Sequence, residues 1–129
     1  MEFNTSINIL SVLAASITSF IFGFIWYGPL FGKTWAKENR LKYDGSGFSF
    51  DKLFYQLLTV LLTVIVLEIL FIGSFYQGLC LILLVWVGFM LSNRFGSMIW
   101  MKQSWVLFFI DSIYYLANLL IIMTVLYLL

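Results

Sequence analysis

The sequence has 129 residues, of which 63% are hydrophobic and 10% are charged, with a net charge of +1. Soluble domains are about 45–50% apolar and about 25% charged, and a soluble globule of this size cannot bury so much apolar surface. The composition therefore excludes a soluble enzyme, a nucleic-acid-binding protein and a disordered chain. It predicts a small integral membrane protein whose surroundings are the lipid bilayer.

The first predicted element is a membrane-spanning helix over residues 7–27, because no charge occurs between Glu2 and Lys33. This length suffices to cross about 30 Å of hydrocarbon. No basic residue precedes it and no small-residue cleavage site follows it, so we expect a retained span rather than a signal peptide. Small residues recur at every fourth position and predict a helix-packing face, made of Ser11, Ala15, Ser19 and Gly23.

The loop over residues 28–52 follows, and Pro29 is expected to begin a short helix in it, since proline suits a first helical turn. Aromatic and aliphatic residues alternate there with charged ones; they are Phe31, Trp35 and Leu41 against Lys33, Lys37, Glu38 and Arg40. This pattern is typical of a helix lying at the membrane interface. Residues 44–47 are expected to end this helix. A plain solvated loop is the alternative to the helix.

Three further hydrophobic spans are predicted over residues 53–72, 76–100 and 104–128, with a turn at residues 73–75. Backbone groups must be satisfied inside lipid, and the runs do not alternate as barrel strands do. We therefore expect an all-α, antiparallel four-helix bundle. Glu68 is expected either to reach the outer headgroups or to bind a proton. The polar face of the second span predicts interhelical hydrogen bonds, from Gln56, Thr59 and Thr63.

The basic residues predict the orientation of these four spans. All seven lie in the first loop or at the third span and the link that follows it. In a four-span topology these positions are on one side of the membrane. The positive-inside rule assigns that side to the cytoplasm of a cell-membrane protein, with both termini outside.

A specific motif stands at the end of the first span, over residues 23–35, and reads Gly-Phe-Ile-Trp-Tyr-Gly-Pro-Leu-Phe-Gly-Lys-Thr-Trp. This run resembles the signature of the family catalogued as domain of unknown function 1761. The matching positions are Trp26, Tyr27, Gly28, Pro29, Phe31, Gly32, Lys33 and Trp35. The resemblance implies a four-helix integral membrane protein and implies no activity. One departure is the link at residues 100–103, where many relatives have an acidic residue.

A second set of small residues lies in the third span, at Gly88, Ser92 and Gly96. The four-residue spacing allows close approach of another helix. The sequence leaves open whether that helix belongs to the same chain or to another subunit, although a homo-oligomer is expected.

Two charges within the third and fourth spans form the candidate functional site. Arg94 precedes Lys102 in the link by eight residues, and Asp111 follows it by nine. Equal distance from the turn of an antiparallel hairpin means equal depth, here about 12 Å. Charges at such depth usually pair, so we expect an Arg94–Asp111 ion pair. The neighbouring polar residues complete the candidate site, which consists of Asn93, Arg94, Asp111, Tyr115 and Asn118.

Two functions remain open from the sequence. The first is an oligomeric transporter or channel that uses the polar site between the third and fourth spans. The second is a non-transporting assembly or accessory protein that packs through its small-residue faces. A lipid-modifying enzyme is disfavoured, because the chain has no histidine and no paired carboxylates for acid–base chemistry. With one cysteine, Cys80, no disulfide is expected, and no cofactor or metal is expected.

Overall fold

The computed structural model describes residues 3–40, 50–71 and 73–129, and these residues form helices and short connections without strands. Four helical stretches in the described ranges are long and apolar enough to cross a membrane: Ile9–Leu30, Asp51–Leu70, Phe75–Met101 and Trp105–Leu128. The prediction of an all-α fold with four spans is confirmed.

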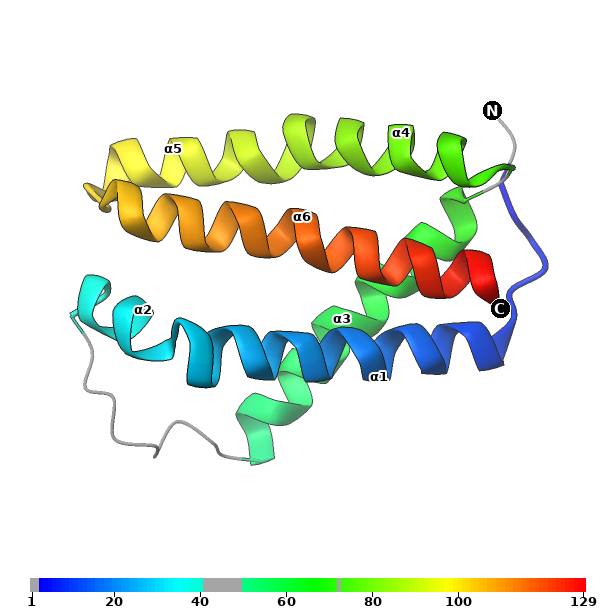
Figure 1. Cartoon of the computed structure of the whole chain (residues 1–129), viewed down its shortest axis with the longest axis horizontal. Coiled ribbons are helices and arrows are strands. Elements are labelled where there is room, and N and C mark those ends of the chain that lie inside the picture. The colour runs from blue at the N-terminus through cyan, green and yellow to red at the C-terminus, as the bar shows by residue number, and fades with distance from the viewer. Residues whose placement is uncertain (1–2, 41–49, 72) are drawn as a thin grey trace.

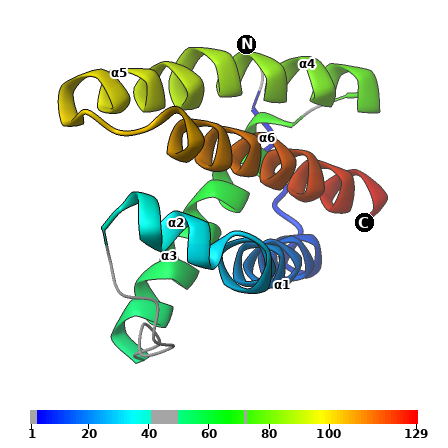
Figure 2. The same ribbon diagram turned by 60° about the vertical axis from the view of Figure 1, so that its left-hand side comes forward.

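Helix α6 (Trp105–Leu128) is the central element of the bundle (Figure 1). It packs against α1 (Ile9–Ile25) on one side and against α4 (Phe75–Val85) on the other. Helix α3 (Phe50–Leu70) crosses α1 obliquely, as Figure 2 shows from a second direction. The core between these helices is aliphatic; its most buried members include Ala15, Val64, Ile82 and Ile122.

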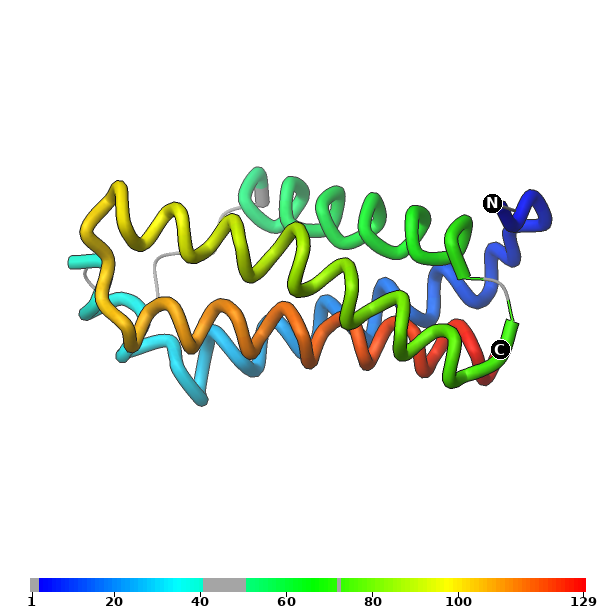
Figure 3. The backbone as a smooth tube through the Cα atoms, turned by 90° about the horizontal axis from the view of Figure 1, so that it is seen from above, coloured from blue at the N-terminus to red at the C-terminus, as the bar shows by residue number. Residues whose placement is uncertain are grey.

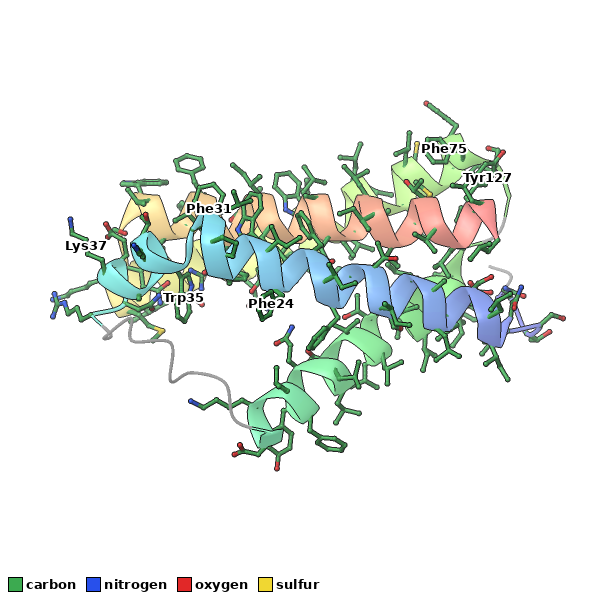
Figure 4. All side chains as sticks on the ribbon, turned by 60° about the horizontal axis from the view of Figure 1, so that its bottom comes forward. Phe24, Phe31, Trp35, Lys37, Phe75 and Tyr127 are labelled. Atoms are coloured by element: carbon green, nitrogen blue, oxygen red, sulfur yellow. The ribbon has the colours of Figure 1, made fainter. Side chains whose placement is uncertain are left out.

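The two ends of the bundle differ in charge. Both termini and the turn at Gly73 lie at one end, which we call the terminal end (Figure 3). The opposite end, which we call the basic end, carries α2 (Gly32–Glu38) and the link around Lys102. Figure 4 shows Lys37 at the end opposite to Phe75 and Tyr127. The predicted one-sided distribution of basic residues is therefore present in the described chain.

Side-chain caps explain where the helices begin. Asn8 Oδ1 accepts hydrogen bonds from the N–H groups of Leu10 (3.0 Å) and Ser11 (3.4 Å). Ser74 and Gln77 form a reciprocal capping box, which satisfies two otherwise unpaired N–H groups. Because Ser74 is the cap, the third span begins at Phe75, a residue that was expected in the turn. Gly73 has φ +113°, a conformation that glycine adopts without strain.

The first span does not end where Pro29 was expected to begin a new helix. Instead α1 continues into a π-helical segment, η1 (Trp26–Leu30), which contains Pro29. Proline lacks an N–H and its ring clashes with the carbonyl four residues earlier, so a regular α-turn is disfavoured here. The wider turn is closed by the N–H of Phe31, which donates to the Trp26 carbonyl at 2.9 Å. The second helix then begins at Gly32.

A second π-helical segment, η2 (Trp86–Leu91), interrupts the third span between α4 and α5 (Ser92–Met101). The extra residue in a π-turn rotates everything that follows it relative to an α-helix. In a regular α-helix Trp86 and Phe89, three residues apart, would lie on one face, but Phe89 is 72% exposed. Trp86 faces inwards and donates from Nε1 to the Ser112 carbonyl at 2.8 Å.

The predicted short helix in the first loop is present as α2. It buries Ala36, half-buries Trp35 and exposes Lys33 and Lys37, so its two faces differ as the sequence pattern indicated. Its position at the headgroup level stays a prediction. Leu41 and the helix-ending residues 44–47 lie outside the described residues.

Candidate functional site

The predicted ion pair between the third and fourth spans is confirmed. Arg94 Nη2 lies 2.9 Å from Asp111 Oδ2, and the side chains are 15% and 10% exposed. Both charges therefore face protein, as expected from the cost of an unpaired charge in hydrocarbon.

Two further residues complete this group. Tyr27, from the first span, donates its hydroxyl to Asp111 Oδ1 at 2.6 Å. Gln103, from the link after α5, accepts from Arg94 Nη2 at 2.9 Å. We call Tyr27, Arg94, Gln103 and Asp111 the polar centre. It joins the first, third and fourth spans at one point near the basic end.

Aromatic contacts hold Tyr27 in place. Its ring lies 4.9 Å from that of Tyr114 and 5.8 Å from that of Trp35, both in edge-to-face geometry. Trp26 packs against Phe31 at 4.6 Å across the bend between η1 and α2. Such pairs add about 0.5–1.5 kcal/mol each beyond area burial. The bend at Pro29 thus lets α2 fold back and support the phenol that reaches Asp111.

The other three predicted site residues lie at different places relative to the polar centre. Tyr115 is half-buried and close enough to Asp111 and Arg94 to interact with them electrostatically. Asn118 lies farther along α6 and accepts from Ser19 Oγ at 2.6 Å, which links the fourth span to the first. Asn93 is exposed on the outside of α5. It does not contact the polar centre, because consecutive helix residues lie about 100° apart and its neighbour Arg94 is the one that faces inwards.

The predicted packing face of the first span lies inside the chain. Ser11, Ala15 and Ser19 are at most 2% exposed. A Cβ built on Gly23 would lie 2.8 Å from the hydroxyl oxygen of Tyr114, closer than real Cβ contacts. This is the close helix approach that small residues permit, and its partner is α6.

The small residues of the third span behave differently. Gly88 and Ser92 are exposed. A Cβ built on Gly88 or Gly96 would meet nothing within 4 Å. This face therefore has no packing partner within the described part of the chain.

Polar residues of the second span have local partners. Glu68 is only 7% exposed, so it does not extend away from the chain, and its Oε1 accepts from the N–H of Asn8 at 3.4 Å. A carboxylate at this helix start suits the positive end of the helix dipole. Thr59 and Thr63 donate to carbonyls of their own helix at 2.7 and 2.9 Å. The expected interhelical bonds from these threonines are not formed.

Polar groups recur along the first span, from the cap of α1 at Asn8 to Tyr27 in η1. We call this set the polar line; from the terminal end it consists of Asn8, Ser11, Ser16, Ser19 and Tyr27. Glu68, Asn118 and Asp111 face it from neighbouring helices. The hydroxyl of Ser16 is buried and has no hydrogen-bond partner among the described residues. The polar centre is thus the basic end of a longer series of polar groups, in which Tyr27 and Asn118 are half-buried and Asn8 is exposed. The other members are buried; they are Ser11, Ser16, Ser19, Glu68 and Asp111.

The model of the family described as "Protein of unknown function (DUF1761)" matches residues 10–127. The chain belongs to this family. The matched range includes the motif at residues 23–35, and the resemblance inferred from that motif is confirmed. No curated protein and no solved structure matches the chain.

The family motif now has a structural explanation in this chain. Trp26, Tyr27 and Pro29 make up most of η1, and Gly32 begins α2. Tyr27 is the residue through which the motif reaches Asp111. Tyr27 was predicted as part of the motif and not of the polar site, because nothing in the sequence places the first span beside the fourth. Within the described residues no three His, Cys, Asp or Glu side chains gather as metal ligands.

Proposed function

We propose that this protein is an oligomeric transporter or channel for a small ion, with the polar centre as the part that responds to the ion. The observation that carries the proposal is the polar line, which recurs along a membrane-spanning helix from Asn8 to Tyr27. Ionisable residues inside membranes are costly and commonly mark ion pathways or proton relays.

The chemistry of the polar centre fits this role. Asp111 is held by a cation and by a phenol from two other spans. A carboxylate in such a setting can exchange its partners when a proton or cation arrives, and Arg94 and Tyr27 would then be released together. The coupling between three spans offers a way to link ion binding to helix movement.

Oligomer formation is part of the proposal, since four helices rarely enclose a pathway alone. Within the most apolar stretch of the third span, only 11% is buried inside the chain. Its outward face carries Gly88 and Ser92, which permit a close helix approach. A second copy of the chain is the partner that we propose for this face.

The orientation that we propose places the basic end in the cytoplasm and both termini outside. In a Cys80→Ser background, a Lys37→Cys variant should resist an impermeant maleimide in intact cells and react after permeabilisation. Tyr76→Cys, at a residue that is 74% exposed at the terminal end, is the matched control and should react in intact cells. Labelling of Lys37→Cys from outside, with Tyr76→Cys protected, would reverse the assignment.

Proton flux into pyranine-loaded proteoliposomes under a potassium diffusion potential tests the transport proposal. Wild-type protein should conduct, and the Asp111→Asn/Arg94→Gln double variant should not, because it keeps hydrogen-bonding groups while it removes both charges. Ser19→Ala should reduce the flux, since it deletes a hydroxyl of the polar line. Thr18→Ala is the matched control, because Thr18 is exposed and bonds only its own helix, at the Ala14 carbonyl.

A non-transporting assembly protein is the second candidate, and the outward small-residue face of the third span favours it. The same proteoliposome preparation distinguishes the two functions. An oligomer that conducts neither protons, sodium nor chloride supports the assembly function. Flux that is unchanged in the folded double variant would leave the polar centre with a structural role alone.

A further inference from the structure

Asn93 is a polar side chain on the outward surface of the third span. It is exposed on α5, which lies at the edge of the bundle beside α6 (Figure 1). Its side-chain amide forms no hydrogen bond with any of the residues that the structure describes. The amide is therefore an unpaired polar group that points away from the rest of the chain.

The depth of Asn93 makes this exposure unfavourable. Trp100 is exposed near the basic end of the same span, and tryptophan is enriched at the level of the headgroups. Asn93 precedes Trp100 by seven residues, which is about 10 Å along a helix. Its side chain is too short to extend to the headgroups as a lysine or arginine does. Because an unpaired amide in hydrocarbon is costly, a partner for Asn93 is expected within the membrane.

Exposed hydroxyl groups of the spans differ from Asn93, because they bond their own helices. Ser92 donates to the Gly88 carbonyl at 2.7 Å, and Thr18 donates to the Ala14 carbonyl at 2.8 Å. These hydroxyls need no second helix. The side chain of Asn93 does, and it lies directly beside the small residues of the third span.

We propose that Asn93 pairs with Asn93 of a second copy of this chain, across a two-fold axis along the membrane normal. The pairing rests on the oligomer of the proposed function and supplies the contact that forms it. Copies inserted in one membrane share one orientation, so a two-fold axis brings the same residue to the same depth. An amide both donates and accepts, so two of them can satisfy each other reciprocally.

The surface around Asn93 admits the helix of a second copy. Gly88 and Ser92 are exposed and small, and a Cβ built on Gly88 or Gly96 would meet nothing within 4 Å. Such positions permit two helix backbones to approach closely, and polar side chains then bond across them. Lipid tails, in contrast, offer neither a donor nor an acceptor at this depth.

The first test measures association of the full chain by energy transfer in phosphatidylcholine liposomes, over a series of protein-to-lipid ratios. Donor and acceptor dyes are attached at Tyr76→Cys in a Cys80→Ser background. Asn93→Leu should weaken association about tenfold, the effect of one interhelical hydrogen bond in a membrane. Asn93→Gln should restore association, because its amide also donates and accepts. Gln56→Leu, which removes an exposed amide from α3, is the matched control and should associate as the wild type does.

The Asn93→Leu monomer should keep the wild-type thermal midpoint in dilute detergent, because the residue is exposed. Unchanged association of this folded variant would overturn the proposal. A loss of association in Gln56→Leu alone would overturn it as well, since the contact would then lie on α3.

The second test examines the two-fold arrangement by oxidative cross-linking. Ser92→Cys in the Cys80→Ser background keeps Asn93 and should give a disulfide-linked dimer. Leu62→Cys, at an exposed position of α3, is the control and should cross-link only at the level of random collisions. Absence of the Ser92→Cys dimer would refute a two-fold contact at this face.

The association tests are independent of transport. A dimer that depends on Asn93 and conducts no ion would support the pairing and contradict the transport function. Ion conduction by a protein whose association does not depend on Asn93 would support transport and contradict the pairing.

Discussion

Replacing Asp111 with Asn should lower the free energy of unfolding in detergent by about 3–5 kcal/mol, because it leaves Arg94 buried without its counter-charge. Arg94 is only 15% exposed and lies 2.9 Å from the carboxylate. The asparagine can still accept from Tyr27, so the loss reports mainly the broken ion pair. The measurement is the thermal midpoint and chemical unfolding of the purified protein.

The double variant Asp111→Asn/Arg94→Gln should recover much of that loss, since removing both partners leaves no uncompensated charge. The introduced glutamine amide can still donate to Gln103, which accepts from Arg94 in the wild type. If Asp111→Asn alone is as stable as the wild type, the pair contributes nothing to the fold. The polar centre would then owe its arrangement to function alone.

Gly23→Leu should destabilise the chain by about 1–3 kcal/mol or prevent its folding, because a side chain cannot be added without overpacking. Even a Cβ atom at this position would lie 2.8 Å from the Tyr114 hydroxyl oxygen. The displaced Tyr114 ring supports Tyr27, so the polar centre should be disturbed as well. Loss of thermal stability in detergent checks the prediction.

Gly88→Leu is the matched control, since a Cβ at Gly88 meets nothing within 4 Å. Its thermal midpoint as a monomer should equal that of the wild type, while its oligomer should dissociate more readily in cross-linking. A Gly23→Leu protein of unchanged stability would contradict the packing of α1 against α6.

The number of spans and the ion pair could be predicted, because each follows from counting residues within a continuous stretch of the sequence. Span number follows from the lengths of apolar runs between polar interruptions. The Arg94–Asp111 pair follows from symmetry about the short link, since the depths of two residues in a hairpin are fixed by their distances from the turn. Both predictions concern neighbours along the chain.

Contacts between spans that are distant in the sequence could not be predicted in this way. Tyr27 reaches Asp111 only because α1 packs beside α6, and no periodicity in either helix indicates that neighbour. The oblique path of α3 is similarly set by which of its residues meet the core. Asn93 was assigned to the site because it is next to Arg94 in the sequence, but consecutive residues of a helix lie about 100° apart around its axis, so Asn93 points outwards while Arg94 points inwards.

The segment η2 gives the third span two different helical phases. An α-helix turns about 100° per residue, so the extra residue in the π-turn places α4 and α5 out of phase with each other. Apolar packing at Ile82 and ion pairing at Arg94 are thereby both directed to α6 from one continuous span. Removing one residue from η2 would leave the span long enough to cross a membrane, yet would swing the guanidinium away from its carboxylate. The length of the apolar span and the direction in which its side chains point are therefore separate constraints on this helix. Substitutions that preserve hydrophobicity can satisfy the first constraint and still change the second.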